Sequence, residues 1–476
     1  MKKLVIYVVA IGVGVLLSFP LVTGFALERA YQSRVASMPQ QPGVEITAES
    51  YDRGWFGSQA LVRVRLHPAE WLGDPTLVSE SFDLLVKSDL QHGPVLFTDL
   101  GVRFGLGYGN LGFAGDNPEG LAQTLSEWLA ATPLTIQTII YFDQTAHTEL
   151  EIQAYSADEG EDHIRFGGLS ASLLTSADLT RFDASFLIRP SSLLTTDLAL
   201  DMTEASGAMN YQGNNPYTLV GESVFALPRL ALNSKAFSLI LEDIKLNHGS
   251  QLNQGKMDFF QTLEISRLES PLPLESARWH MEVLGVSPEG LEQWSEVSLE
   301  IQQAVSAGTL PVDAMGEAQL TPELEHRLTQ VMQTLLQPGL GFVQRLDVGA
   351  LGAPHHAHLN LEFVGLPAGV SWDSLEDPMQ FLPAFRGALD LELDEAAVMG
   401  SQFAAMVQPY QQQGLLLTEQ GKLVLRAALA DGVLMLNDNP LPLEAMLQSA
   451  MAPEPGSEPG SESAAEPMGS TLTPTE

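Results

Sequence analysis

The residue types best suited to chemistry lie in one short segment, His355-His356-Ala357-His358-Leu359-Asn360-Leu361-Glu362-Phe363. Its alternation of apolar and polar residues predicts a β-strand, with His356, His358, Asn360 and Glu362 on one face. Histidines two residues apart on a strand have Cα atoms about 6.6 Å apart, close enough to share one metal ion if a neighbouring strand supplies a third ligand. His356 and His358 are therefore the candidate metal ligands. The alternative is the polar outer face of a half-buried strand, which needs no metal.

A second motif, Gly107-Tyr108-Gly109-Asn110-Leu111-Gly112, satisfies the glycine pattern of dinucleotide-binding sites. In those sites the glycines lead directly into a helix, whereas Phe113 to Asp116 intervene here and no βαβ unit follows. We interpret the segment as a glycine-rich loop or a bulged strand. The signatures of serine hydrolases, zinc proteases and phosphate-binding loops are missing from the sequence. We therefore predict no catalytic residue and no cofactor.

The composition narrows the function classes further. The chain of 476 residues contains 59 acidic and 23 basic residues, for a net charge of −36, and it has no cysteine. The negative charge would repel nucleic acid. The lack of cysteine excludes disulfides, thiolate nucleophiles and iron-sulfur centres. Paired carboxylates arise by default in so acidic a chain, and we interpret them as a solvated face.

The elements that must position these residues are mainly strands. Period-two alternation recurs along the chain, and Asp431-Gly432 has the composition of a two-residue hairpin turn. We predict a mainly β fold of the α+β class, with a long antiparallel sheet and a few helices packed on its apolar face. Three helix starts combine a capping residue, proline and glutamate: Asn117-Pro118-Glu119, Ser287-Pro288-Glu289 and Thr321-Pro322-Glu323.

Two of the predicted helices can be described in more detail. The helix that begins at Pro288 should turn Trp294, Val297 and Ile301 inward, because these residues share one helical face. A further helix is predicted from Asp394 to about Val407, ended by Pro409.

The amino end predicts a membrane anchor. Residues 4–27 carry no charge, and Lys2 and Lys3 precede them. A helix of about 20 apolar residues crosses a bilayer, and the positive-inside rule leaves residues 1–3 in the cytoplasm. A cleaved signal peptide is the alternative. We expect residues 28–450 to form one β-rich periplasmic domain. Residues 451–476, rich in proline, glycine, serine and glutamate, should form a disordered tail.

Several short motifs resemble a known family. Tyr51-Asp52-Arg53-Gly54-Trp55-Phe56-Gly57-Ser58 follows the anchor, and His92-Gly93-Pro94 follows that. Leu291-Glu292-Gln293-Trp294, Gly432 to Asn437 and Pro442-Leu443-Glu444 continue the series. Together they resemble the YdgA-like bacterial envelope proteins, a family of unknown function.

The resemblance implies a single-pass inner-membrane protein whose carboxyl-terminal domain lies in the periplasm. It implies no catalytic residue at any position of this chain. The motif residues are Tyr51, Arg53, Gly54, Phe56, Ser58, His92, Gly93 and Pro94. On physical grounds, we interpret Tyr51 to Ser58 as a turn that leads into a strand, with Phe56 packed under Gly54 and Gly57. A functional alternative places Arg53 and His92 at one polar site.

These observations favour a non-catalytic role in the cell envelope. A half-buried sheet can offer a hydrophobic groove to an acyl chain or to the strand of a partner. The expected partners are the inner membrane, through residues 4–27, and a lipid or another envelope protein. We also expect that the protein can form a homo-oligomer, and we do not expect it to bind nucleic acid. The alternative is a metal-dependent or other periplasmic hydrolase centred on His355–His358.

Overall fold

The computed structural model describes residues 20, 23–25, 28–29, 44–67, 82–98, 101–114, 134–160, 162–271, 273–306, 310, 320–370, 372 and 378–441. Most of the predicted anchor, the helix expected after Pro118 and the predicted tail lie outside these residues. Within the described ranges, the helices are all too short or too polar to cross a bilayer.

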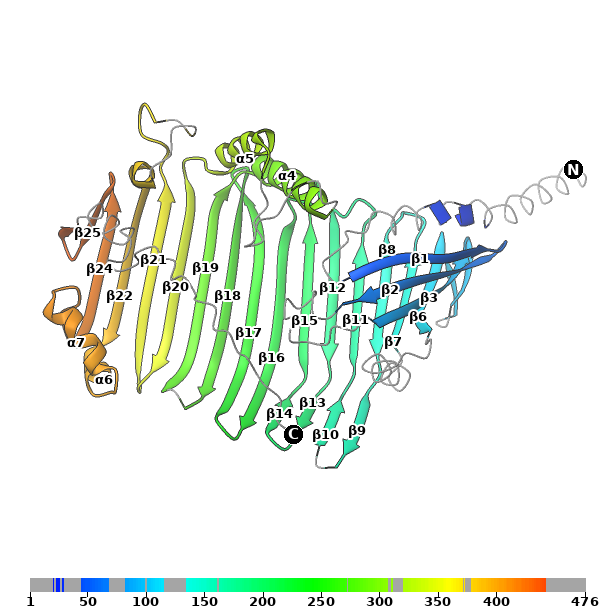
Figure 1. Ribbon diagram of the computed structural model, residues 1–476, viewed down its shortest axis with the longest axis horizontal. Helices are drawn as coiled ribbons and strands as arrows, with labels where there is room; N and C mark the ends of the chain where they lie inside the picture. Colours follow the sequence, from blue (N-terminus) through cyan, green and yellow to red (C-terminus); the bar gives the residue numbers. More distant parts are fainter. Residues whose placement is uncertain are drawn as a thin grey trace, which may run out of the picture.

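One continuous antiparallel sheet, which contains 24 of the described strands, dominates the molecule (Figure 1). Its amino-terminal part pairs the following strands in this order: β1 (Val44–Arg53), β2 (Gly57–Leu66), β3 (Phe82–His92), β6 (Gly107–Ala114), β7 (Leu134–Ile140), β8 (Ala146–Ile152), β11 (Leu169–Thr175), β12 (Arg181–Ile188) and β15 (Ala205–Gln212).

The sheet continues through longer strands to the carboxyl end. These are β16 (Val220–Ser234), β17 (Ser238–Asn253), β18 (Lys256–Glu269), β19 (Leu274–Val286), β20 (Leu340–Ala350), β21 (Ala353–Phe363), β22 (Phe385–Asp394), β24 (Lys422–Ala430), β25 (Val433–Leu436) and β26 (Asn439–Leu441). The predicted mainly β, antiparallel fold is therefore confirmed. The glycine pattern at Gly107 lies in β6, within the sheet.

Short strands extend the sheet at two places, and a further pair forms a ribbon of its own. Alongside β15, the long β16 also pairs with β14 (Leu198–Met202), which leads to β13 (Ser191–Leu194), β10 (Asp162–Phe166) and β9 (Tyr155–Glu159). The short β23 (Leu417–Glu419) pairs with β24. A separate two-stranded ribbon is formed by β4 (Val95–Thr98) and β5 (Gly101–Phe104).

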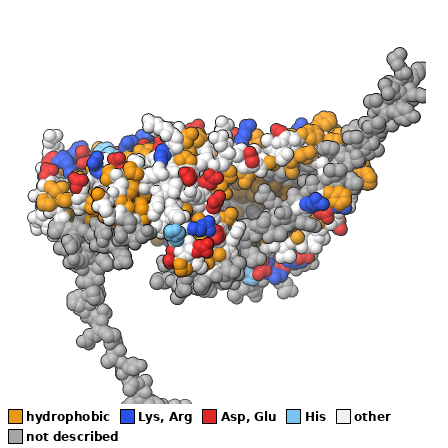
Figure 2. Space-filling model, turned by 90° about the horizontal axis from the view of Figure 1, so that it is seen from above, with side chains coloured by type: hydrophobic (Ala, Val, Ile, Leu, Met, Phe, Trp, Pro, Cys, Tyr) orange, Lys and Arg blue, Asp and Glu red, His pale blue; other side chains and the backbone are white. Residues whose placement is uncertain are grey.

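The sheet does not stay flat at its amino-terminal end. In Figure 1, β1 to β3 lie in front of β8 and β11 and run across the direction of those strands. Figure 2, which views the molecule from above, shows a hollow on this side with hydrophobic side chains on its visible wall. Strand twist accumulates across a sheet, so a sheet of this width curls unless something holds it flat.

Two helices connect β19 to β20. They are α4 (Pro288–Ser306) and α5 (Pro322–Leu335), and they begin at the prolines where the sequence places them. The Ser287 and Thr321 hydroxyls accept hydrogen bonds from backbone N–H groups of the first turns. In Figure 1 the pair lies along the upper ends of the strands. The prediction for Trp294 is wrong, because its side chain is 44% exposed whereas Val297 is 3% exposed. The helix buries a narrower stripe than its apolar residues suggest.

The carboxyl-terminal helices lie against the sheet. A 3-10 helix, η2 (Pro378–Ala384), precedes β22, and α6 (Glu395–Met399) and α7 (Ala404–Gln412) follow it. Val398 and Val407 from these helices pack with Leu416 and Leu423. The predicted single helix ended by Pro409 is wrong: the chain breaks at Gly400, and Pro409 lies inside α7. One missing N–H is tolerated in a helix this short because packing, not length, stabilises it.

Candidate functional site

Opposite residues of an antiparallel pair point to the same side of the sheet, so the register traces each face. One such row crosses fourteen strands from β6 to β24 and contains only apolar residues. We call it the apolar row. Its members are Leu111, Ile136, Leu150, Ala171, Phe186, Gly207, Phe225, Leu246, Leu263, Trp279, Leu346, Ala357, Leu391 and Leu425. Thirteen steps of about 4.8 Å give the row a length of about 60 Å along the sheet.

The apolar row is not covered like an ordinary protein core. Gly207 is buried, because the ring of Phe186 lies over it and stacks with Phe225 at a centroid distance of 6.2 Å. Leu346 is 40% exposed, and the other members of the row are half-buried. A row of apolar residues that remains this accessible is a candidate surface for binding apolar material.

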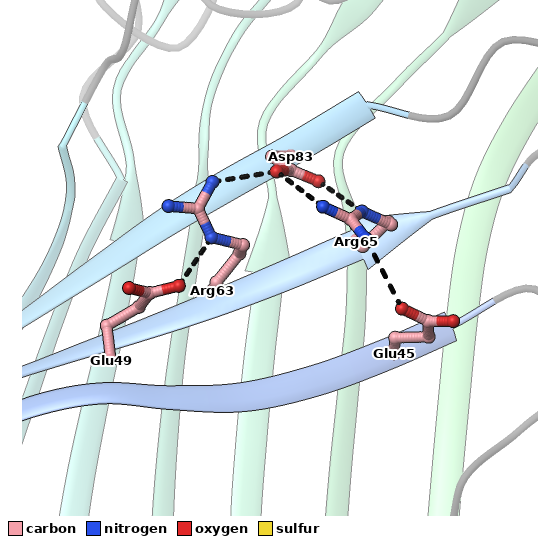
Figure 3. Close-up of polar contacts among 5 residues, drawn as sticks. All are labelled: Glu45, Glu49, Arg63, Arg65 and Asp83. Carbon is pink, nitrogen blue, oxygen red and sulfur yellow. Dashed lines mark hydrogen bonds and ion pairs between the residues drawn. The ribbon is translucent and has the colours of Figure 1, made fainter.

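The opposite face of the sheet is charged. Figure 3 shows five charged side chains on β1 to β3, where the Arg63 guanidinium lies 2.6 Å from a carboxylate oxygen of Glu49 and 2.7 Å from one of Asp83. Arg65 also contacts Asp83, at 2.8 Å, and lies 3.7 Å from Glu45. The hydrogen bond from Arg65, together with that from Arg63, lowers the pKa of Asp83 although partial burial opposes this shift. The contrast between the two faces leaves the apolar row as the surface suited to an apolar ligand.

The structure places the predicted metal ligands on the charged face. His356 Nδ1 lies 2.6 Å from a carboxylate oxygen of Asp347. His358 is opposite Arg345 on one side and Asp390 on the other, so a cation occupies one neighbouring position. Among the described residues, no three histidine, aspartate or glutamate side chains converge as a metal site would require. His356 and His358 thus lie among charged neighbours on the outer face, and metal binding by these residues stays a prediction.

His355 points to the other side of the sheet and is 8% exposed. Its Nδ1 accepts a hydrogen bond from the Asp394 backbone N–H, at 3.2 Å, so its Nε2 carries the proton and donates to the Ala350 carbonyl, at 3.0 Å. Both ring nitrogens are thus occupied, and the side chain ties the start of α6 to the β20–β21 turn. His355 therefore faces the opposite side of the sheet from His356 and His358.

The motif residues at the amino end do meet in space. His92 is 2% exposed, and its Nε2 lies 2.9 Å from the Ser58 hydroxyl. Its backbone N–H donates to the Phe56 carbonyl, at 2.8 Å, while the Gly54 N–H donates to the Gly57 carbonyl. Phe56 itself is 58% exposed, so the interpretation that it packs beneath the glycines is wrong. The turn is held by backbone hydrogen bonds and by His92 instead.

Close backbone contacts explain the glycine of the His92-Gly93-Pro94 motif. A Cβ added to Gly93 would lie 1.7 Å from the Gly105 carbonyl oxygen, so only glycine fits. The Gly93 N–H donates to Leu106, and the Pro94 carbonyl accepts from Gly105. These bonds join the end of β3 to the segment between β5 and β6.

The end of the amino-terminal segment contacts the same cluster. Gly24 lies against the His92 ring, and a Cβ added to it would lie 2.6 Å from a ring carbon. The Arg53 guanidinium lies 3.6 Å from the centroid of the Phe25 ring and pairs with Glu28. Burial, and secondarily the positive charge of Arg53, lowers the pKa of His92. Arg53 and His92 thus both contact the chain's own amino-terminal segment, and a shared functional site stays a prediction.

The two motifs at the amino end, Tyr51–Ser58 and His92–Pro94, therefore form one structural unit at the beginning of the sheet. A family model of bacterial proteins of unknown function, DUF945, matches residues 1–444. The chain belongs to this family. Neither a curated protein nor a solved structure matches the chain. Within the DUF945 family, the resemblance to YdgA-like envelope proteins stays a prediction.

This family member also contains a cavity that sequence reasoning missed. It has a volume of about 400 Å³ and lies between the apolar face of β20 to β22 and the helices α6 and α7. Its lining includes Leu346, Ala357 and Leu391 of the apolar row, together with Val398, Phe403 and Met406. Strand alternation accounts for the apolar wall, because Leu391 and Leu393 lie on one face of β22. Nothing local to the sequence indicates that α6 and α7 leave a cavity beside it.

Proposed function

We propose that the protein is a non-catalytic component of the cell envelope, anchored in the inner membrane, that binds acyl chains along the apolar row in the periplasm. The observation that carries this proposal is the row itself, which combines an unbroken apolar register across fourteen strands with side chains that remain partly accessible. Burying one methylene group stabilises a complex by about 0.8 kcal/mol. An extended acyl chain therefore gains binding free energy along the whole length that it buries.

The amino-terminal contacts support the placement of the sheet near a membrane. Residues 4–27 have the length and composition of an anchor, and Gly24, Phe25 and Glu28 contact β1 to β3 through His92 and Arg53. An anchor whose end is fixed to the first strands would hold the hollow end of the sheet beside the bilayer. The proposal predicts that the intact mass of the mature protein includes residues 1–27.

Two exposed hydrophobic side chains provide a matched test of acyl binding. Met209 on β15 lies on the side of the apolar row and is 41% exposed, whereas Val224 on the adjacent β16 lies on the opposite side and is 43% exposed. Met209→Glu should weaken the binding of cis-parinaric acid, a fluorescent fatty acid, by about tenfold or more, because a carboxylate beside the chain must be desolvated. Val224→Glu should leave the affinity unchanged.

The measurement is a fluorescence titration of the detergent-free protein, accompanied by mass spectrometry of lipids that co-purify with it. Circular dichroism must show the same sheet content for both variants. Equal loss of affinity in the two variants, or no saturable binding to the parent protein, would contradict the proposal.

A further inference from the structure

The cavity under α6 and α7 lies at the carboxyl-terminal end of the apolar row. Its wall is formed by Leu346, Ala357 and Leu391, which occupy consecutive positions of the row on β20, β21 and β22. Its roof is formed by Val398 of α6 and by residues of α7 and the connection before it. Because wall and row are the same residues, the cavity is a covered continuation of the open face.

The chemistry of the lining restricts the occupant. Apart from the two adjacent histidines at its edge, the named lining residues offer hydrocarbon side chains only. His355 uses both ring nitrogens within the protein, and His356 turns its Nδ1 to Asp347. Water needs two to four polar partners to occupy a cavity, so an apolar cavity of this kind stays dry or takes an apolar ligand. A polar headgroup would find no partner here.

The rim leaves a route into the cavity. Leu346 is 40% exposed where the row passes beneath the helices, and Met406 of α7 is 62% exposed above it. By contrast, Val398 and Val407 are 5% and 9% exposed and pack against the sheet. An extended hydrocarbon lying on the row can therefore continue past Leu346 without displacing the packed part of the helices. A volume of about 400 Å³ is within the usual range of small-ligand sites.

We propose that this cavity is a terminal site that takes the methyl end of one acyl chain whose remaining length lies on the apolar row. The inference rests on the proposed function and adds the direction in which the acyl chain lies. Its carboxylate or headgroup lies toward β19, and its methyl end lies under α7.

The absence of cysteine allows a site-specific test in the full chain. Met406→Cys, labelled with an environment-sensitive fluorophore, places a reporter at the rim. Val433→Cys, at 48% exposure on the opposite face of the same end, is the control. The probes are stearic acids carrying a nitroxide at carbon 5 or carbon 16. We expect saturable quenching at position 406, stronger with the carbon-16 probe, and none at position 433.

A blocking variant completes the experiment. Ala357→Trp fills the cavity from the sheet side, and Ala428→Trp adds the same side chain on the charged face as a control. Ala357→Trp should raise the probe concentration that gives half-maximal quenching at position 406 by about tenfold. This is the loss of affinity expected when roughly two methylenes leave the cavity. Circular dichroism and thermal unfolding establish that both variants are folded.

The outcomes separate the two proposals. If the fatty acid binds in a manner sensitive to Met209→Glu but quenching at position 406 is absent, or is stronger with the carbon-5 probe, the terminal site is wrong and the proposed function stands. If the affinity measured by quenching at position 406 is unchanged in Ala357→Trp, the terminal site is also wrong. If no fatty acid binds to the parent protein, both proposals fail.

Discussion

His92 illustrates how one residue can organise a turn without taking part in chemistry. Its Nε2 shares a hydrogen bond with the Ser58 hydroxyl, and Gly24 lies against the ring. A histidine beside a serine hydroxyl is also the beginning of a nucleophilic pair, but such a pair must meet a substrate. Here the space beside the ring is filled by the chain's own amino-terminal segment. The contact therefore fixes the segment to β2 and β3.

The pKa of His92 gives a prediction for the pH dependence of stability. Burial lowers this pKa, so the folded protein holds His92 neutral while the unfolded chain binds a proton near pH 6.5. Its contribution is fully present above about pH 6.5 and is lost as the pH falls toward the lower folded pKa. We expect His92→Gln to flatten the fall in unfolding free energy between about pH 7 and 5, measured by denaturant titration.

The control is His326→Gln, which changes an exposed histidine on α5. This variant should retain the pH dependence of the parent protein. A parent-like slope in His92→Gln would show that His92 does not titrate in this range.

At the scale of elements, neighbouring residues in the sequence determine where the helices begin, and tertiary packing determines which of their side chains are buried. Thr321 and Ser287 cap α5 and α4 because their hydroxyls accept hydrogen bonds from first-turn N–H groups that lack helical partners. Which apolar residues are buried depends instead on the partner surface. Leu335 of α5 packs directly against Gly290 of α4, so the two helices approach closely there and leave Trp294 to one side.

This packing predicts an order of stability effects within α4. Val297→Ala removes a side chain that is 3% exposed and should lower the unfolding free energy by about 1–2 kcal/mol, through lost burial and a residual cavity. Trp294→Ala should cost less than Val297→Ala, since the indole is 44% exposed. Denaturant midpoints and hydrogen exchange of the α4 amides measure both variants. A larger effect at Trp294 would mean that the indole is covered in solution.

At the scale of the whole molecule, the sheet carries the apolar row on one face, and its other face is charged at β1 to β3 and at β20 to β22. Ordinary antiparallel sheets bury the apolar face under a second layer. In the described part of this chain, α6 and α7 cover only its carboxyl-terminal end, where Leu423 is fully buried. At the amino-terminal end the sheet curls around the hollow seen in Figure 2. The width of the sheet, the accessible row and the curl together make a long apolar surface, to which we assign the proposed acyl-chain binding.

The contacts between the amino-terminal segment and β1 to β3 predict a local effect of truncation. Removing residues 1–29 exposes the His92 ring and deletes both partners of Arg53. Hydrogen exchange should become faster in β1 to β3 and stay unchanged in β17 to β19, because antiparallel strands lose protection near the lost contacts first. Hydrogen exchange monitored by mass spectrometry compares the truncated and full chains. Unchanged protection of β1 to β3 would show that the segment does not dock.

The sequence by itself determined features that depend on neighbouring residues. Alternation identified the strand β21 and its two faces. The Asp431-Gly432 turn was predicted correctly, and both residues have positive φ, at 51° and 79°. Such features follow from the φ preferences of single residues and from the two-residue period of a strand.

Only the tertiary structure decided which distant residues meet. Ser58 and His92 are 34 positions apart, and His355 and Asp394 are 39 apart. Their contacts depend on strand register, and so does the apolar row, whose fourteen members come from as many strands. A shift of one residue in any pairing would send a side chain to the other face. Periodicity therefore shows that each strand has an apolar side, while only register and curl align those sides into one surface.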